Sequence, residues 1–209
     1  MTGRHTKQEI GQKYNDFASK YDLAEAIPEL LGLRRLRKSL LSQAEGNVLE
    51  IAAGTGRNLQ YYPTGCNITA IDLSEGMMGK ARKKASDLGI TVDFHYMDAE
   101  DLSFEQNSFD TVVDTLSACT FLDPVKALGE MARVCKPGGK ILLLEHGRSN
   151  RGWLGRFQDW RADSHARQLG CVWNREPQDM VLEAGLLVIS ARRSFLGIFH
   201  TVVASPPTG

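Results

Sequence analysis

Two acidic residues and two glycines in the first third of the chain have the types and spacing of a cofactor site. Glu50 lies in the apolar run 48–51, which predicts a short buried strand. Gly54 and Gly56 follow in a turn where the backbone must bend sharply and approach a ligand that a Cβ would block. With a helix expected from near Arg57, this stretch predicts a nucleotide-type cradle.

The residue types in this cradle favour S-adenosylmethionine over a phosphate-bearing ligand. Phosphate loops place bare amides and a helix N-terminus against anionic oxygens, and Glu50 would repel such a ligand. S-adenosylmethionine has no phosphate and carries an ammonium and a sulfonium group, which an acid suits. The pattern Gly-x-Gly-x-x-Leu, without a following Gly-Lys-Ser/Thr, also excludes a phosphate loop and disfavours a nicotinamide dinucleotide.

A second acid strengthens this interpretation. The run 67–72 predicts the next strand and ends in Asp72, about twenty residues after the glycine turn. An acid at this spacing can accept hydrogen bonds from both hydroxyls of a ribose. The combination of Glu50, the glycine turn and Asp72 is therefore much more specific than the glycines alone.

With these residues in view, the chain resembles the class I S-adenosylmethionine-dependent methyltransferases. The resemblance rests on residues 48–56, 70–74, 109–113 and 137–139, and covers roughly residues 13–145. Ala52 stands where the family most often has the first glycine of its loop. This departure is similar to the quinone C-methyltransferase branch of ubiquinone and menaquinone biosynthesis.

The resemblance implies a set of cofactor-binding residues: Tyr14, Tyr21, Glu50, Ala52, Gly54, Gly56, Asp72, Leu73, Met77, Asp98, Ala99 and Thr115. In the family, the segment with Tyr14 and Tyr21 folds over the cofactor, an apolar side chain at Met77 lies against the adenine, and Asp98 and Ala99 contact the ring. The alternatives are ordinary ones: an amphipathic helix packed on the sheet, a core methionine and a surface acid.

Two residues are candidates for a general base beside the methyl group. Asp114 begins the segment 114–119, which leaves the carboxyl end of the strand predicted at 109–114, where ligands bind in open α/β sheets. His146 follows the strand predicted at 140–145 and could take a proton from an acceptor, or line the pocket without catalysing. A carbon or phenol acceptor needs such a base, whereas a thiolate or free amine needs only positioning.

For two predicted helices, the sequence does not decide whether their faces contact the core, solvent, a substrate or a membrane. The helix predicted at 28–43 has an apolar stripe and a basic face that could be solvated or lie on a membrane surface. The helix predicted at 153–170 carries Trp153, Phe157 and Trp160 on one side, and this stripe could face the core, roof an apolar substrate or touch a membrane. Its Asp159, Asp163 and His165 do not share one face, so we expect no metal site there.

Bulk composition excludes several classes. The 25 basic residues equal the 25 acidic ones, which argues against binding nucleic acid through a global positive field. The four scattered cysteines indicate free thiols in a reducing compartment, and residues 1–9 are polar and expected to be loose. With no signal peptide or membrane span in the sequence, we expect a cytoplasmic protein, with a peripheral membrane contact left open.

The sequence thus predicts one α/β domain with a Rossmann-like methyltransferase fold: about seven mostly parallel strands with helices on both faces. We expect a helical cap at 1–45, a cofactor-binding core at 46–146, substrate-side helices at 147–185 and a terminal hairpin at 186–204. The expected activity is methyl transfer from S-adenosylmethionine to a small, apolar acceptor such as a quinone or lipid. The alternatives are a thiol, amine or natural-product acceptor, a non-catalytic cofactor-binding domain, and a nicotinamide oxidoreductase.

Overall fold

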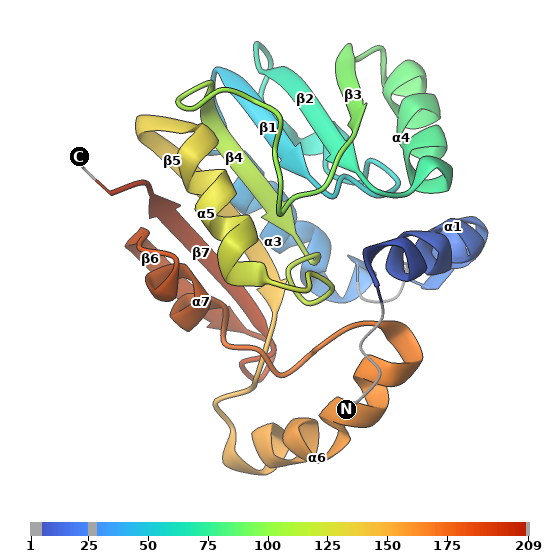
Figure 1. Cartoon of the computed structure of the whole chain (residues 1–209), viewed down its shortest axis with the longest axis vertical. Coiled ribbons are helices and arrows are strands. Elements are labelled where there is room, and N and C mark those ends of the chain that lie inside the picture. Colours follow the sequence, from blue (N-terminus) through green and yellow to red (C-terminus); the bar gives the residue numbers. More distant parts are fainter. Residues whose placement is uncertain (1–5, 25–28, 208–209) are drawn as a thin grey trace.

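A seven-stranded sheet runs through the molecule in the order β3-β2-β1-β4-β5-β7-β6 (Figure 1). The computed structural model describes residues 6–24 and 29–207, but not the side chains of residues 17–24, 31 and 169. The strands are β1 (Asn47–Ile51), β2 (Asn67–Asp72), β3 (Val92–Tyr96), β4 (Phe109–Thr115), β5 (Cys135–His146), β6 (Leu187–Ser194) and β7 (Phe199–Ser205). The first five pair in parallel, and β7 is antiparallel to both β5 and β6. The predicted mostly parallel sheet with a terminal hairpin is confirmed.

Helices cover both faces of this sheet. They are α1 (Lys7–Ala24), η1 (Glu29–Leu33), α3 (Arg34–Leu41), η2 (Leu59–Tyr61), α4 (Glu75–Leu88), α5 (Pro124–Val134), α6 (Gly152–Leu169) and α7 (Pro177–Glu183). Figure 1 shows α5 and α7 in front of the sheet, α3 behind it, and α1 and α6 beyond the end of β4. α1 and α6 therefore lie at the edge of the sheet where ligands bind in open α/β folds, outside the carboxyl ends of the parallel strands.

The middle of the sheet is buried on both sides, as the apolar run of β5 shows. Ile141 and Leu143 pack in the cluster with the buried side chains of α5, while Leu142 and Leu144 pack in the cluster with those of α3. Alternate side chains of a strand point to opposite faces. A strand that is apolar at every position is therefore stable only between two helical layers, which is what the uninterrupted run predicted.

Two helix starts agree with the sequence and fix the loops at the edge of the sheet. Ser74 caps α4, its Oγ accepting from Met77 N at 3.1 Å. Asp123 caps α5, its Oδ1 accepting from Lys126 N at 2.9 Å, with Pro124 at the first helical position. Each capping residue comes directly after a segment that lines the site described below.

Three local expectations were wrong. The helix predicted at 28–43 is divided between η1 and α3, because Gly32 has a φ of 130°, outside the helical region. The helix expected from near Arg57 is only the three-residue turn η2, which gives way to an extended Tyr62 before Pro63, as the proline ring requires. β5 begins at Cys135 rather than at residue 140, because Cys135 pairs with Phe109 ahead of a bulge.

Part of the stretch 1–9 that was expected to be loose is helical. α1 begins at Lys7, whereas residues 1–5 lie outside the described part of the chain. Asn15 ties this helix to the start of α4, because its Oδ1 accepts from Gly76 N at 2.9 Å and from Ser74 Oγ at 2.6 Å. A Cβ on Gly11 would lie 3.0 Å from the carbonyl oxygen of Leu73, so α1 lies close against the end of β2.

Candidate functional site

The turn after β1 uses its two glycines for different purposes. Gly54 and Gly56 have φ values of 58° and 74°, and Ala52 adopts 47°, which is uncommon for a residue with a Cβ. A Cβ on Gly56 would lie 2.9 Å from Leu59 Cδ1 and 3.1 Å from Ala81 Cα, so this glycine lets the turn pack on α4. A Cβ on Gly54 would meet only the Ala52 carbonyl oxygen at 3.9 Å. Gly54 thus presents its backbone to open space.

Asp72 holds this turn from the end of β2. Its Oδ2 accepts from Gly54 N and its Oδ1 from Ser74 N, both at 2.8 Å. Burial raises the pKa of the carboxyl, and these backbone hydrogen bonds oppose that rise. A carboxylate has about four lone-pair sites, and the backbone of Gly54, Ser74 and Leu73 uses three of them, so Asp72 can still accept from a ribose hydroxyl while it holds the turn.

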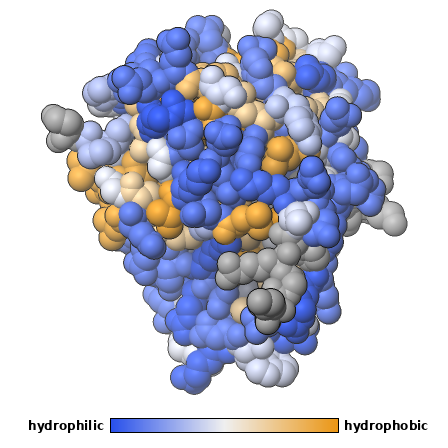
Figure 2. Space-filling model, viewed as in Figure 1, coloured by the Kyte–Doolittle hydropathy of each residue, from blue (hydrophilic) through white to orange (hydrophobic). Residues whose placement is uncertain are grey.

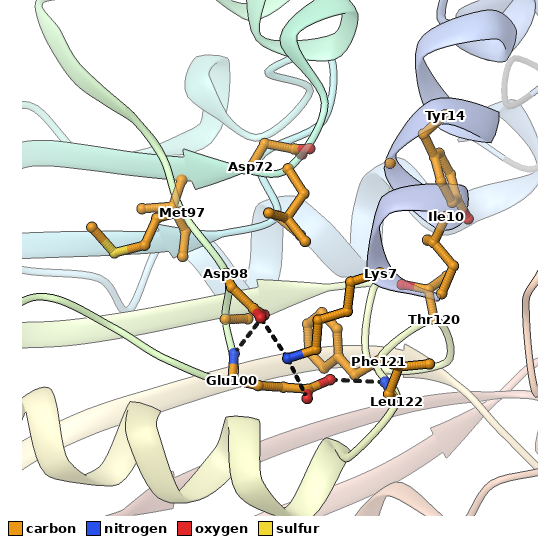
Figure 3. Close-up of a pocket in the computed structure, with 15 residues that line it drawn as sticks. Lys7, Ile10, Tyr14, Asp72, Met97, Asp98, Glu100, Thr120, Phe121 and Leu122 are labelled. Carbon is orange, nitrogen blue, oxygen red and sulfur yellow. Dashed lines mark hydrogen bonds and ion pairs between the residues drawn. The ribbon is translucent and has the colours of Figure 1, made fainter. Parts of the chain in front are cut away.

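A cavity with a volume of about 70 Å³ lies beside this turn, and we call it the donor cavity because predicted cofactor residues line it (Figure 3). It is lined by Lys7, Ile10, Gly11, Tyr14, Ala52, Ile71, Asp72, Leu73, Met97, Asp98, Ala99, Glu100, Thr120, Phe121 and Leu122. Six of these were among the predicted cofactor residues: Tyr14, Ala52, Asp72, Leu73, Asp98 and Ala99. Three different strand ends and α1 therefore bring half of the predicted set to one cavity.

Lys7 and Glu100 in this cavity were not anticipated. Lys7 Nζ lies 2.5 Å from Asp98 Oδ2 and 2.8 Å from Glu100 Oε2, reaching between them in Figure 3. Glu100, 5% exposed, also accepts from the backbone N of Leu122 and Asp123 at 2.8 and 3.1 Å. Nothing in the sequence distinguishes it from a surface acid, because its partners come from α1 and from the segment before α5.

The other predicted cofactor residues lie outside the donor cavity: Glu50, Gly54, Gly56, Met77 and Thr115, while the side chain of Tyr21 is outside the described residues. Met77 is a buried side chain of α4, 2% exposed. Thr115 accepts through its Oγ1 from Asn58 Nδ2 at 3.0 Å and from Arg37 Nη1 at 2.8 Å. Thr115 therefore belongs to the buried network beneath the turn.

Glu50 is the acid of that network. It is 1% exposed, and its two oxygens accept from Asn58 Nδ2 at 2.9 Å and from Tyr62 Oη at 3.1 Å. Burial raises its pKa to about 7, although these hydrogen bonds and the charge of Arg37 favour the ionised form. Its ionisation thus falls in the physiological range, directly below the glycine turn.

Arg37 corrects the interpretation of the basic helix. Arg34, Arg35 and Lys38 of α3 are exposed, but Arg37 is only 3% exposed. It pairs with Glu29 Oε1 at 2.8 Å and donates to Asn58 Oδ1 at 2.9 Å. The helix therefore points one of its four basic groups inward, where a charge must be paired.

The predicted base Asp114 is fully buried at the carboxyl end of β4. It accepts from Ser117 Oγ and lies against Glu145 of β5. Burial raises the pKa of both carboxyls, and the charge of Asp114 adds to the rise at Glu145. Among the described residues, Asp114 Oδ2 and Glu145 Oε2 have no hydrogen-bond partner, and one proton shared between the two carboxyls satisfies both.

A second cavity, about 450 Å³ in volume, lies on the other side of the β4–α5 segment, and we call it the acceptor cavity for the role proposed below. It is lined by Ile10, Cys119, Thr120, Phe121, Leu122, Ala162, Asp163, Ala166, Arg167, Gly170, Val172, Asn174 and Arg175. Ile10 and residues 120–122 line both this cavity and the donor cavity. The two cavities are therefore neighbours with a common wall.

The far wall of the acceptor cavity is fixed by α6 and the turn after it. Gln158, 3% exposed, accepts from Ser149 N at 2.7 Å and donates to the Gly147 carbonyl at 2.9 Å. The His165 ring stacks on Trp173, with ring centroids 4.4 Å apart. These contacts attach α6 to the end of β5, which the sequence did not predict.

The aromatic stripe of α6 does not face the core. Trp153, Phe157 and Trp160 are 64, 47 and 75% exposed, so that interpretation was wrong. The part of α6 visible in Figure 2 is mainly hydrophilic. None of the helices in residues 6–24 and 29–207 has both the length and the apolar character needed to cross a membrane.

The predicted base His146 lies at the end of β5 beside two thiols. Its Nε2 is 3.3 Å from Cys171 Sγ, and Cys119 completes a group whose ligand atoms all lie within 4.8 Å of one another. Hydrogen bonding from Cys119 lowers the pKa of Cys171 to about 5 against the effect of burial, and His146 contributes to the fall. Sequence spacing could not reveal this group, because its members are 25 or more residues apart.

Comparison with known proteins settles the family. Residues 49–143 match the model of a methyltransferase domain. The chain is 34% identical to the demethylmenaquinone methyltransferase of Renibacterium salmoninarum over 173 residues, covering 80% of this chain and 70% of that protein. The chain belongs to the class I S-adenosylmethionine-dependent methyltransferases. Its methyl donor is S-adenosylmethionine, and the open face of Gly54 and the spare lone pair of Asp72 fit that cofactor.

Other relatives of this methyltransferase carry different names. It is 31% identical to the mitochondrial methyltransferase OMS1 of Saccharomyces cerevisiae, over 91% of this chain but only 45% of that protein. It is 32% identical to the phosphatidylethanolamine N-methyltransferase of Cereibacter sphaeroides, over 62% of this chain and 70% of that protein. The crystal structure of the [4+2]-cyclase SpnF superposes with a TM-score of 0.79 at 19% identity, covering 98% of this chain and 97% of that one. That likeness concerns the fold alone.

Proposed function

We propose that this methyltransferase transfers the methyl group of S-adenosylmethionine to a small, largely apolar acceptor bound in the acceptor cavity. The observation that carries the proposal is the wall of Ile10 and residues 120–122 that lines both cavities. S-adenosylmethionine in one cavity and the acceptor molecule in the other can come into contact where this shared wall ends. Because methyl transfer is an in-line displacement, holding the two reactants close and aligned contributes most of the acceleration.

The donor side binds the cofactor through its backbone turn and two acids. Asp72 accepts from a ribose hydroxyl, the bare face of Gly54 admits the cofactor, and Glu50 below the turn attracts the ammonium group of its methionine part. Asp98 is the acceptor for the adenine amino group, so Lys7 withdraws from Asp98 when the ring enters. Tyr14 closes the cavity from α1.

The composition of the acceptor cavity supports an acceptor with both apolar and polar parts. Its apolar lining residues are Ile10, Phe121, Leu122, Ala162, Ala166 and Val172. Its polar lining residues are Thr120 on the shared wall and Asp163, Arg167, Asn174 and Arg175 on α6 and the turn after it. A volume of about 450 Å³ falls in the range of small-molecule sites, roughly 300–1,000 Å³.

His146 is the group that we assign to proton transfer, where the acceptor requires it. It adjoins Cys171, whose neighbours Gly170 and Val172 line the acceptor cavity. Asp114, the other candidate, lies fully buried against Glu145 and lines neither cavity. A carbon or hydroxyl acceptor needs a base at this position, whereas a free amine does not.

A lipid acceptor at a membrane surface is the second candidate. It is favoured by the exposed Trp153, Phe157 and Trp160 on α6, since aromatic side chains concentrate at membrane interfaces. Such an enzyme should sediment with liposomes of anionic phospholipid, and the Trp153→Ala/Trp160→Ala variant should lose this binding. Failure of the native chain to sediment would reject this candidate.

The proposal is tested by transfer of a labelled methyl group from S-adenosylmethionine into a cell extract, followed by partition between organic and aqueous phases. We expect label in the organic phase, and its loss in the Asp72→Ala variant. Label confined to the aqueous phase would contradict an apolar acceptor. Absence of label in either phase, with S-adenosylhomocysteine still bound, would favour a non-catalytic cofactor-binding domain.

A further inference from the structure

Three segments far apart in the chain each place a metal-binding type of side chain at the same point of the sheet edge. Cys119 follows β4, His146 ends β5, and Cys171 follows α6. The two sulfur atoms and a ring nitrogen all lie within 4.8 Å of one another, with 3.3 Å between His146 Nε2 and Cys171 Sγ. Among the described residues, no other group of three His, Cys, Asp or Glu side chains converges in this way.

These separations agree with the dimensions of a zinc site. Zinc takes thiolate sulfur at about 2.3 Å and imidazole nitrogen at about 2.0–2.1 Å in a tetrahedron, which puts ligand atoms roughly 3.5–3.8 Å apart. The observed atoms need to move by only a few tenths of an ångström to about an ångström to reach that arrangement. Two thiolates and a neutral imidazole also balance the charge of the ion, which matters where both cysteines are less than 10% exposed.

The surrounding backbone holds the three ligands in place. Val172 N donates to the Cys119 carbonyl at 2.9 Å, which joins the segments that carry the two cysteines. The Cys171 carbonyl accepts from His165 Nδ1 at 2.9 Å, and His165 is itself stacked on Trp173. Metal ligands supported by such outer hydrogen bonds lose little freedom when the ion binds.

Cys119 and Cys171 are both free thiols in the structure, so neither is used in a disulfide. Thiolate is the form that binds metal, so both cysteines release their protons when the ion binds, and metal affinity rises with pH.

We propose that Cys119, His146 and Cys171 bind one Zn²⁺ ion whose fourth coordination position faces the acceptor cavity. Cys119 itself lines that cavity, and the neighbours of Cys171 on both sides do so too. Three protein ligands and one open position are the pattern of catalytic rather than structural zinc. The proposal that these residues bind zinc does not depend on which acceptor is methylated. Only the role of the open coordination position rests on the proposed function.

With zinc bound, His146 is a ligand, so the zinc site replaces the role of general base proposed for His146 above. The open position would then take over the task of deprotonation, because an acceptor hydroxyl or thiol loses its proton to solvent when it binds the ion. The resulting oxygen or sulfur anion attacks the methyl carbon, the carbon–sulfonium bond breaks, and S-adenosylhomocysteine leaves as a neutral thioether. The methyl ether or thioether formed binds zinc weakly and dissociates.

The test is metal binding by the purified, reduced chain. Elemental analysis of protein produced with zinc should give about one zinc per chain. The apo-protein titrated with Co²⁺ should develop sulfur-to-cobalt charge-transfer absorption. Cys119→Ser and Cys171→Ser should each lower its intensity by about half. His146→Ala should retain it while weakening metal affinity by more than about 100-fold, since loss of even an outer partner of a ligand costs about 10–100-fold. Cys66→Ser, which removes a thiol outside the group, should match the native chain.

Retained S-adenosylhomocysteine binding identifies variants that are still folded. Absence of bound zinc, or cobalt spectra without charge-transfer bands in the native chain, would overturn the proposal. None of these measurements involves methyl transfer, so a failed metal site and a failed acceptor assignment give different results.

Discussion

The donor and acceptor sides of this site are built in different ways. The donor side is formed by consecutive elements, because β1, the glycine turn and β2 place Gly54 against Asp72 only 18 residues away. The acceptor side joins segments that are 25 or more residues apart, namely those of Cys119, His146 and Cys171. Backbone hydrogen bonds within one supersecondary unit fix the first side. The second depends on how α6 and its following turn dock onto the sheet.

The largest effect is expected on the acceptor side. His146→Ala should reduce turnover by about 10²-fold or more, equivalent to about 2.7 kcal/mol, whether His146 acts as a base or as a zinc ligand. Affinity for S-adenosylhomocysteine should not change, because β4 separates β5, which carries His146, from β1 and the glycine turn. Steady-state kinetics and calorimetry check the two parts. His95→Ala, at a half-buried position of β3, is the matched control. Near-normal turnover of His146→Ala would mean that His146 only lines the site.

The corresponding change on the donor side is Asp72→Ala. It should weaken binding of S-adenosylhomocysteine by about 1–3 kcal/mol, because the ribose loses its acceptor and the amides of Gly54 and Ser74 lose theirs. Calorimetric titration measures this loss, and Asp93→Ala in the neighbouring β3 serves as the control. Unchanged affinity in a folded variant would remove the ribose role from Asp72.

The donor side could be predicted from the sequence because its signals are local. Glycines in a strand-turn-helix context require positive φ, and Asp72 is identified by its distance from them along the chain. Even so, the helix expected at Arg57 is a single turn, since Pro63 follows too soon. Glu50 was recognised as important, but its burial with Asn58 and Tyr62 was not visible from the sequence.

The two glycines offer the next comparison, now within the donor side. Replacement of either by Ala imposes a positive φ on a residue with a Cβ, at about 1–2 kcal/mol in folding free energy. Gly56→Ala should cost more stability than Gly54→Ala, because only its Cβ collides with Leu59 and Ala81. Gly54→Ala should instead lose cofactor affinity. Urea denaturation and calorimetry separate the two, and equal effects of both changes would refute the division of roles.

A smaller, pH-dependent effect is expected from Glu50. Its pKa of about 7 means that Glu50 ionises mostly between about pH 6 and 7.5. An α-amino group, with a usual pKa of about 7.7–8.0, is still mostly charged over this interval. Affinity for S-adenosylhomocysteine should rise several-fold over this interval, because the carboxylate attracts the ammonium group. The charged or titratable groups near Glu50 are Arg37, Tyr62 and Asp72.

The same shift has the opposite sign for the stability of the free protein. The folded state holds the Glu50 proton more tightly than the unfolded state, whose pKa is near 4.5. The contribution of Glu50 to the free energy of unfolding therefore falls as pH rises from about 4.5 to 7 and is constant above that. Glu50→Gln should flatten both pH profiles, and persistence of either slope in that variant would assign it to another group.

The acceptor side could not be predicted to the same degree because its contacts are made between distant elements. The sequence indicated free thiols at Cys119 and Cys171, but not their approach to each other and to His146. Their partners lie on other segments, so spacing along the chain carries no information about them. The donor side has hidden contacts of the same kind: Arg37 lies in the network beneath the glycine turn, and Lys7 pairs with Asp98, 91 residues away.

The smallest expected effect is on the free energy of unfolding, and it distinguishes an exposed from a buried side chain of α6. Trp160 is 75% exposed, so Trp160→Ala should change the free energy of unfolding by no more than about 0.5 kcal/mol. Gln158 lies two residues earlier, and Gln158→Ala should destabilise by about 1–3 kcal/mol because the buried Ser149 N loses its acceptor. Thermal and urea unfolding of the two variants measure the difference. A large loss from Trp160→Ala would mean that the aromatic stripe is covered in solution, and α6 would then belong to an interface rather than to a free wall of the acceptor cavity.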